Sequence, residues 1–330
     1  MGSVAVSLIA VLALCGGVSV ETHPSASESR SVSADPPLTV PRAQLTSALH
    51  CQRAVKGART EPVLLLPGTG SDGADLYPSG FQPDLSAEQV PSCYLNLPDH
   101  TTGDMQVSAE YVVFALRTMA RRSHQRVVVY GFSQGGVLAR LALTHWPSMR
   151  SAVTDVVSVA APQHGSTVSA DCPTDGCSAA NWQRRTDSRL LMALNRGDES
   201  PGSTAWTTVR TLDDAIDQPV DGPRPTSTLR GASDLAVQQI CPGRQVDHLA
   251  MSFDAVVYAM LRDAATHRGP ARAARLPRQA CNKVFVGDTP VDQRRAQLSA
   301  LYNTISGTNA AAPRLSAEPP VRLAAQQRRR

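Results

Sequence analysis

The chain has 330 residues, of which 42% are hydrophobic, and this is enough to bury one large core or two small ones. Its formal net charge of +4 owes much to three consecutive arginines at the C-terminus, Arg328 to Arg330. Because no basic patch interleaved with aromatic residues accompanies that charge, the composition gives no reason to expect nucleic-acid binding.

The first residues of the chain resemble a secretory signal peptide. Val4–Leu14 is an apolar run that is too short to span a bilayer, although no Lys or Arg precedes it. Leu12-Ala13-Leu14-Cys15 loosely resembles a lipoprotein box, but Leu14 is a poor residue in front of the cysteine. We expect residues 1–20 to be removed on export and residues 21–44, rich in Ser, Pro and Ala, to be a flexible lead-in. No other segment is long and apolar enough to cross a membrane.

Apolar runs bounded by turn residues then alternate with helical patterns. Leu45–Val55 is expected to be a short helix that carries Cys51. The predicted strands are Pro62–Leu66, Cys93–Leu97, Val127–Tyr130, Val153–Ala160 and Trp206–Arg210. The predicted helices are a stretch after Asp104, Gly136–Leu143, Ser188–Asn195, Ser252–Asp263 and Thr289–Gly307. Thr289 is expected to cap the last of these helices. Strands that alternate with helices form parallel sheets, so we expect an α/β fold with a mostly parallel central sheet and helices on both faces over residues 45–308. Residues 309–330 are rich in Ala, Pro, Arg and Gln and are expected to be a disordered tail.

The segment Arg126–Leu143 carries the strongest functional signal. It places Ser133 between Gly131 and Gly135 at the joint of a valine-rich strand and a helix, which is the G-x-S-x-G pattern of a nucleophile elbow. The turn forces strained backbone angles on the serine, and side chains at the two glycines would collide with neighbouring elements. A glycine-rich turn with a solvated serine is the alternative, but the flanking strand and helix favour an active Ser133.

The loop Pro67–Ser71, which follows the first predicted buried strand, is the second candidate. In an α/β-hydrolase the loop at this place supplies half of the oxyanion hole, and its glycines let backbone N–H groups approach the substrate. An ordinary strand-terminating turn is the alternative. The presence of the elbow favours the functional interpretation.

A serine nucleophile also needs a base that takes its proton and an acid that orients the base. In α/β-hydrolases these follow in the order Ser, Asp or Glu, His, and the chain offers Ser133, an aspartate within residues 213–217, and His248. His164 precedes the acidic loop and has the wrong order, and His267 follows a helix. His248 is therefore the expected base.

Four motifs in this order, within residues 45–306, resemble the Candida antarctica lipase B type of serine esterase, which has the α/β-hydrolase fold. They are the oxyanion loop Leu66-Pro67-Gly68-Thr69-Gly70, the elbow Phe132-Ser133-Gln134-Gly135-Gly136, the acid loop Asp214-Ala215-Ile216-Asp217-Gln218-Pro219 and the histidine loop Val246-Asp247-His248. The resemblance implies that Ser133 is the nucleophile, His248 the base and then the acid, and Asp214 the orienting carboxylate. It thereby selects one of three aspartates that the residues alone leave open.

The resemblance also implies an oxyanion hole made by Thr69 and the backbone N–H of Gln134. Phe132 stands where the family has Trp, Gln163 where it has the Asp of Ala-Pro-Asp, and Arg184 where it has the last Gln of Trp-Gln-Gln. We expect Phe132 to widen the alcohol side of the substrate pocket. Gln163 and Arg184 are expected to alter the acyl side, because an amide and a cation replace a carboxylate and an amide.

Six cysteines remain beyond Cys15 of the expected signal peptide. An even number in an exported chain favours disulfides over a metal site, and no C-x-x-C pair or histidine cluster supports a metal. The resemblance implies two of the pairs, and a third pair, without a counterpart in the family, is expected to close a small loop. The expected pairs are Cys51–Cys93, Cys241–Cys281 and, for the small loop, Cys172–Cys177.

We therefore expect a secreted serine ester hydrolase, a lipase that acts on acylglycerols through an acyl-enzyme. The alternatives are a soluble-ester esterase, a polyester depolymerase, an acyltransferase, or a non-catalytic hydrolase-fold module that binds lipid. The intact set of Ser133, Asp214 and His248 argues against the last of these. We expect no metal and no organic cofactor, a lipid or small ester as substrate, and a monomer. The apolar stripe of helix Thr289–Gly307 is expected either to contact a lipid surface transiently or to pack against the body of the protein.

Overall fold

Seven strands form one sheet. They are β1 Leu49–Cys51, β2 Val63–Leu66, β3 Ser92–Leu95, β4 Val127–Phe132, β5 Val153–Val159, β6 Ala205–Arg210 and β7 Ser233–Ala236. Their order in space is β1-β3-β2-β4-β5-β6-β7, and only the pair β1 and β3 is antiparallel. The expected α/β fold with a mostly parallel sheet is confirmed.

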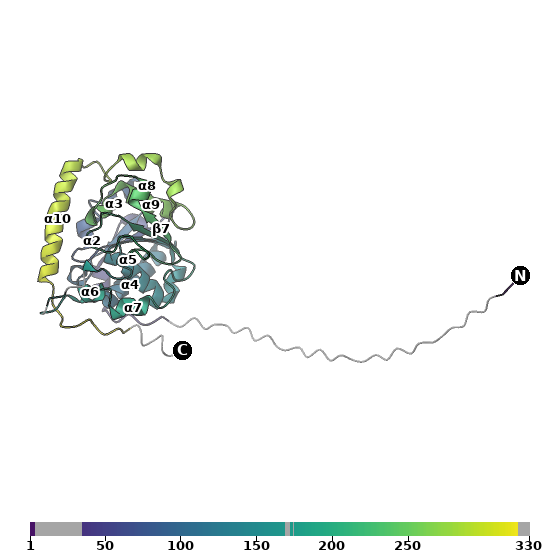
Figure 1. The fold of residues 1–330 in the computed structure, drawn as a ribbon, viewed down its shortest axis with the longest axis horizontal. Coiled ribbons are helices and arrows are strands. Elements are labelled where there is room, and N and C mark those ends of the chain that lie inside the picture. The colour runs from purple at the N-terminus through teal and green to yellow at the C-terminus, as the bar shows by residue number, and fades with distance from the viewer. Residues whose placement is uncertain (4–34, 169–171, 174, 323–330) are drawn as a thin grey trace. The chain divides into compact units, whose positions relative to one another are not determined.

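The computed structural model describes residues 1–3, 35–168, 172–173 and 175–322, and all its helices and strands lie within the unit Ala34–Arg330 (Figure 1). The α-helices are α1 Arg42–Ser47, α2 Gly73–Leu76, α3 Phe81–Ala87, α4 Met105–Ser123, α5 Gln134–His145, α6 Ala179–Gln183, α7 Arg189–Leu194, α8 Val237–Ile240, α9 Ala255–Thr266 and α10 Val291–Ala311. The 3-10 helices are η1 Arg53–Val55, η2 Pro98–Thr101, η3 Pro147–Ser151, η5 Leu249–Ser252, η6 Ala273–Arg275 and η7 Arg278–Asn282. The expected signal peptide lies outside the described residues, apart from residues 1–3.

The sheet separates two hydrophobic cores. Successive side chains of a strand point to opposite faces, so Leu64 and Leu66 of β2 enter one core and Val63 and Leu65 enter the other. All four side chains are fully buried, because helices α4 and α5 contribute to the first core and α3 and α9 to the second. Figure 1 shows α4 and α7 on one side and α3 and α9 on the other.

The expected helix Leu45–Val55 is wrong. The chain forms α1, then the strand β1, then the single turn η1. β1 pairs with β3 in a register that sets Cys51 opposite Cys93, and a disulfide joins the two. Cys51 therefore lies on a strand, because a partner far along the chain supplies hydrogen bonds that local sequence cannot reveal.

The expected flexible lead-in is corrected for its described part. Glu110 of α4 accepts hydrogen bonds from the backbone N–H groups of Thr39 and Val40, the latter at 2.9 Å. Arg117 of the same helix pairs with Asp35 at 2.7 Å. Residues from 35 onward are thus held on α4 by two charged side chains of that helix.

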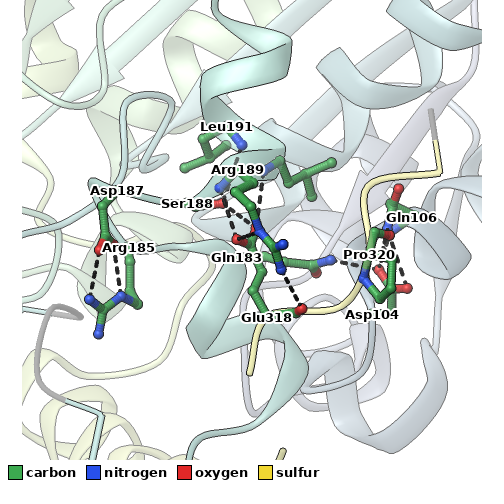
Figure 2. Close-up of polar contacts among 11 residues, drawn as sticks. Asp104, Gln106, Gln183, Arg185, Asp187, Ser188, Arg189, Leu191, Glu318 and Pro320 are labelled. Atoms are coloured by element: carbon green, nitrogen blue, oxygen red, sulfur yellow. Dashed lines mark hydrogen bonds and ion pairs between the residues drawn. The ribbon is translucent and has the colours of Figure 1, made fainter. Parts of the chain in front are cut away.

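The expected disordered tail is also wrong for its described part. The first residues of this part continue α10, and residues 312–322 then form an extended segment, here called the C-terminal strap. Glu318 of the strap accepts hydrogen bonds from Ser188 Oγ at 2.8 Å and from the backbone N–H groups of Arg189 at 2.9 Å and Leu190 at 3.0 Å (Figure 2). A carboxylate at this place caps the N-terminus of α7. The order of the strap comes from a helix about 130 residues away in sequence, which composition does not show.

The strap also holds the small disulfide loop. Leu315 donates its backbone N–H to the carbonyl of Cys177 at 2.7 Å and accepts from Trp182 Nε1 at 2.8 Å. Disulfides join Cys172 to Cys177, Cys241 to Cys281 and Cys51 to Cys93. The three expected disulfides are therefore confirmed.

Among the described helices, none is both long enough and apolar enough to cross a membrane.

Candidate active site

Ser133 lies at the joint between β4 and α5 with a φ of +52° and a ψ of −126°. Its backbone N–H donates to the carbonyl of Val159 at 2.8 Å, which fixes the turn on the neighbouring strand β5. A Cβ at Gly131 would approach the nitrogen of Gly136 to 2.5 Å, and a Cβ at Gly135 would approach the carbonyl oxygen of Leu66 to 2.6 Å. Both glycines are therefore required for this strained serine, as the sequence indicates.

His248 and Asp214 form a hydrogen-bonded pair. The distance between His248 Nδ1 and Asp214 Oδ2 is 2.8 Å, and both side chains are nearly buried. An ionised carboxylate can only accept, so Nδ1 carries the proton and Nε2 is left as the acceptor. The other oxygen of Asp214 accepts the backbone N–H groups of Ile216 at 2.8 Å and Asp217 at 2.9 Å, and this turn of the acid loop fixes the carboxylate.

Two opposing effects act on the pKa of His248. Burial alone lowers it, but the charge of Asp214, the hydrogen bond to Asp214 and the charge of Asp217 raise it, so that the pKa lies above its ordinary value. The imidazolium is therefore stabilised in this site, which suits a base that must hold a proton during the reaction.

The other two aspartates of the acid loop occupy different environments. Asp213 is exposed, and its Oδ2 accepts from the backbone N–H of Val246 at 3.1 Å, which ties the acid loop to the histidine loop. Asp217 is fully buried, and its two carboxyl oxygens have no hydrogen-bond partner among the described residues. The burial of Asp217 beside the pair was not expected, because a sequence does not reveal which aspartate of a loop turns inward.

The expected oxyanion loop packs directly against the serine. A Cβ at Gly68 would approach Cβ of Ser133 to 2.9 Å, and Thr69 Oγ1 donates to Oε1 of Gln134 at 2.6 Å. Gln134 is the first residue of α5, and backbone N–H groups in the first turn of a helix have no acceptor within that helix. Thr69 and Gln134 thus offer donors on one side of Ser133, where they can stabilise negative charge.

A cavity of about 1100 Å³ opens over these residues and is lined by both Ser133 and His248. Helix α10 forms one wall through Leu298, Tyr302 and Ile305. The expected position of helix Thr289–Gly307 beside the site is confirmed in its placement, although the helix begins at Val291, after Pro290 rather than Thr289 at the cap.

Two of the three expected pocket residues, Phe132 and Arg184, line the cavity. Gln163 does not, and the expectation for it is wrong. Its side chain is fully buried and donates to Ser158 Oγ at 3.0 Å, while its backbone carbonyl accepts from Asn195 at 3.2 Å. Gln163 therefore belongs to the core packing, because its side chain bonds to β5 and its backbone carbonyl bonds to the residue that follows α7.

Comparison with known proteins agrees with this geometry. A PGAP1-like alpha/beta domain model matches residues 100–181. Lipase B of Pseudozyma antarctica is 29% identical over 291 residues, which cover 86% of this chain and 85% of that protein. The chain has the α/β-hydrolase fold and resembles the lipase B type of serine esterase. The crystal structure of Aspergillus fumigatus lipase B matches this chain with a TM-score of 0.79 and 25% identity over 88% of this chain and 73% of that one.

The resemblance inferred from the four motifs is thus confirmed, and it supports a carboxylic ester hydrolase.

Proposed function

We propose that the protein is a secreted lipase that hydrolyses acylglycerols through an acyl-enzyme on Ser133. Oγ of Ser133 attacks the ester carbonyl carbon while Nε2 of His248 takes its proton, and Asp214 stabilises the imidazolium that forms. The C–O bond to the alcohol then breaks, and His248 returns the proton to the leaving oxygen. Water, activated by the same histidine, releases the acyl group.

Thr69 and the backbone N–H of Gln134 are proposed to bind the negative oxygen of the tetrahedral intermediate. Donors of this kind contribute about 3–4 kcal/mol each to the stabilisation of the transition state. The backbone N–H of Gln134 needs no reorganisation, because Gln134 directly follows Ser133 at the start of α5.

One observation carries the proposal: His248, which is bonded to Asp214 at 2.8 Å, lines the same cavity as the strained Ser133. A lipid substrate is supported by the cavity wall that α10 forms, because this wall presents the largely apolar side chains of Leu298, Tyr302 and Ile305. The three disulfides support export, since such bonds persist in oxidising compartments.

The experiment compares hydrolysis of a tributyrin emulsion with hydrolysis of soluble p-nitrophenyl acetate, using the wild-type protein and Ser133→Ala. A lipase shows activity on both that is lost in the variant, with faster turnover on the emulsion. Activity confined to p-nitrophenyl acetate would identify an esterase instead. Activity on either substrate that survives in a folded Ser133→Ala protein would contradict the proposed mechanism.

A further inference from the structure

The oxyanion loop, which carries the proposed donor Thr69, is held by hydrogen bonds to η2. Gly70 donates its backbone N–H to the carbonyl of His100 at 2.9 Å, and the carbonyl of Ser71 accepts from Thr101 Oγ1 at 2.8 Å. These bonds fix the residues that follow Thr69. The N–H of Gly70 is used in the fold, so the direction of Thr69 decides what this loop offers to a substrate.

The last turns of α10 cover the same loop at Gly70. A Cβ added there would collide with Asn309 Nδ2 and would lie 3.0 Å from both Asn309 Cγ and Ile305 Cγ2. Gly70 also has a φ of +81°, so both its conformation and its surroundings require glycine. The helix therefore lies directly on the backbone of the residue that follows Thr69.

Asn309 is fixed in this position by its own helix. Its Nδ2 donates to the carbonyl of Ile305 at 2.9 Å, and its Oδ1 is buried without a hydrogen-bond partner in the described part of the chain. Asn309 thus meets Gly70 through van der Waals contact. The C-terminal strap anchors this end of α10, because Leu315 donates its backbone N–H to the carbonyl of Cys177 at 2.7 Å.

We propose that Asn309 is a positioning residue for the oxyanion hole and that it acts through its contact with Gly70. Thr69 lies between Gly68, which packs against Ser133, and Gly70, which α10 covers. Without this cover the loop can tilt, and the donors of Thr69 then leave the place where the negative oxygen forms. A misplacement of about 1 Å can cost about 10²-fold in rate. This inference rests on the proposed function, because it assumes that Thr69 binds the oxyanion.

The test measures kcat and KM of Asn309→Ala on p-nitrophenyl acetate and p-nitrophenyl octanoate. The variant is expected to lower kcat by at least about tenfold on both esters with little change in KM, because the loop acts on the transition state and not on the acyl chain. The inhibition constant of an alkyl trifluoromethyl ketone, to which Ser133 adds to form an oxyanion, should rise by the same factor. Asn303→Ala makes the same change at an exposed residue of α10 and should keep the wild-type values.

Asn309→Leu is the conservative variant. It keeps the branched shape of the side chain, and with it the contact with Gly70, so it should retain most of the wild-type kcat. A kcat as low as that of Asn309→Ala would overturn the inference, because contact would then not be what positions the loop. Melting temperatures show whether each variant is folded, and Asn309→Ser, with the same expected loss, replaces Asn309→Ala if the latter is not.

An unchanged kcat in folded Asn309→Ala, or an unchanged inhibition constant of the ketone, would overturn the inference. A loss confined to KM or to the octanoate would overturn it as well, because Asn309 lines the cavity and would then act by touching the acyl chain. All these outcomes leave the proposed function intact. A wild-type protein that hydrolyses neither ester would instead overturn the proposed function and this inference together.

Discussion

The ring of Phe132 lies 5.0 Å from the ring of His248, measured between centroids, and the two planes are tilted by 48°. Phe132 is the last residue of β4 and directly precedes Ser133, so the backbone of the elbow fixes it against the histidine. It lines the cavity although only 3% of its surface is exposed. In the proposed mechanism, the leaving alcohol passes this ring.

Phe132→Trp should therefore narrow the range of secondary alcohol esters that the protein hydrolyses, and Phe132→Ala should widen it. A change of a few methylenes shifts discrimination by roughly 1–3 kcal/mol each in a tight pocket. The measurement is the enantiomer ratio on a chiral secondary ester, together with the melting temperature. If Phe132→Ala lowers stability by about 3–5 kcal/mol and leaves the ratio unchanged, the ring has only a packing role.

The two inward-facing aspartates should differ sharply in their effects on catalysis. Asp214→Asn should lower kcat/KM by about 10⁴-fold, as removal of a triad carboxylate does, because the amide no longer fixes the tautomer of His248. Asp217→Asn should cost far less, since Asp217 makes no hydrogen bond to the histidine. A greater loss in Asp217→Asn would mean that the acid is wrongly assigned.

The pH dependence follows from the same pair. His248 must be neutral to act as a base, so kcat/KM rises with pH through the pKa of His248, which is raised above its ordinary value. The negative charge of Asp217 contributes to that rise, and Asp217→Asn removes it. The acidic limb of the variant's profile should therefore shift to lower pH, and a shift to higher pH would contradict this electrostatic account.

The C-terminal strap should contribute to stability through one side chain. Glu318→Ala removes the acceptor for four groups at the start of α7, including Ser188 Oγ and Arg189 Nε, and should lower the free energy of unfolding by about 1–2 kcal/mol. Urea unfolding of Glu318→Ala and of Asp221→Ala, a control at an exposed carboxylate, measures the difference. An equal free energy of unfolding in the two variants would show that the contacts of Glu318 with α7 do not stabilise the protein.

Helix α10 should act at the lipid surface. Tyr302 is 50% exposed and lines the cavity, so Tyr302→Glu should reduce activity on an emulsion more than activity on a soluble ester. Asn303→Glu adds the same charge at the next residue of the helix, which is also exposed, and should have a smaller effect. Equal losses on both substrates would assign Tyr302 to packing or to direct substrate contact.

Much of the fold was predictable because its signals are local. The valines of β4 and the glycines around Ser133 specify a buried strand and a tight turn by their own chemistry. The helix-capping role of Glu318 and the strand β1 were not predictable, because each depends on a partner distant in sequence. In the candidate site, too, the features with local sequence signals were predictable and those that depend on distant partners were not.

Residue order and family motifs predicted the pairing of His248 with an aspartate, and the resemblance selected Asp214, which the structure places at the correct nitrogen. Neither could show that Gln163 turns into the core or that Asp217 is fully buried. The direction of a loop side chain is decided by the packing around it, and one sequence contains no record of that packing.

The central claim is that Ser133 is the nucleophile, and covalent labelling tests it most directly. Incubation with a p-nitrophenyl alkylphosphonate, followed by intact-mass measurement and peptide mapping, should show one phosphonyl group per chain, attached to Ser133, with loss of esterase activity in proportion to labelling. His248→Ala should label far more slowly. Labelling at another residue, or full activity in a protein whose Ser133 is completely phosphonylated, would contradict the account.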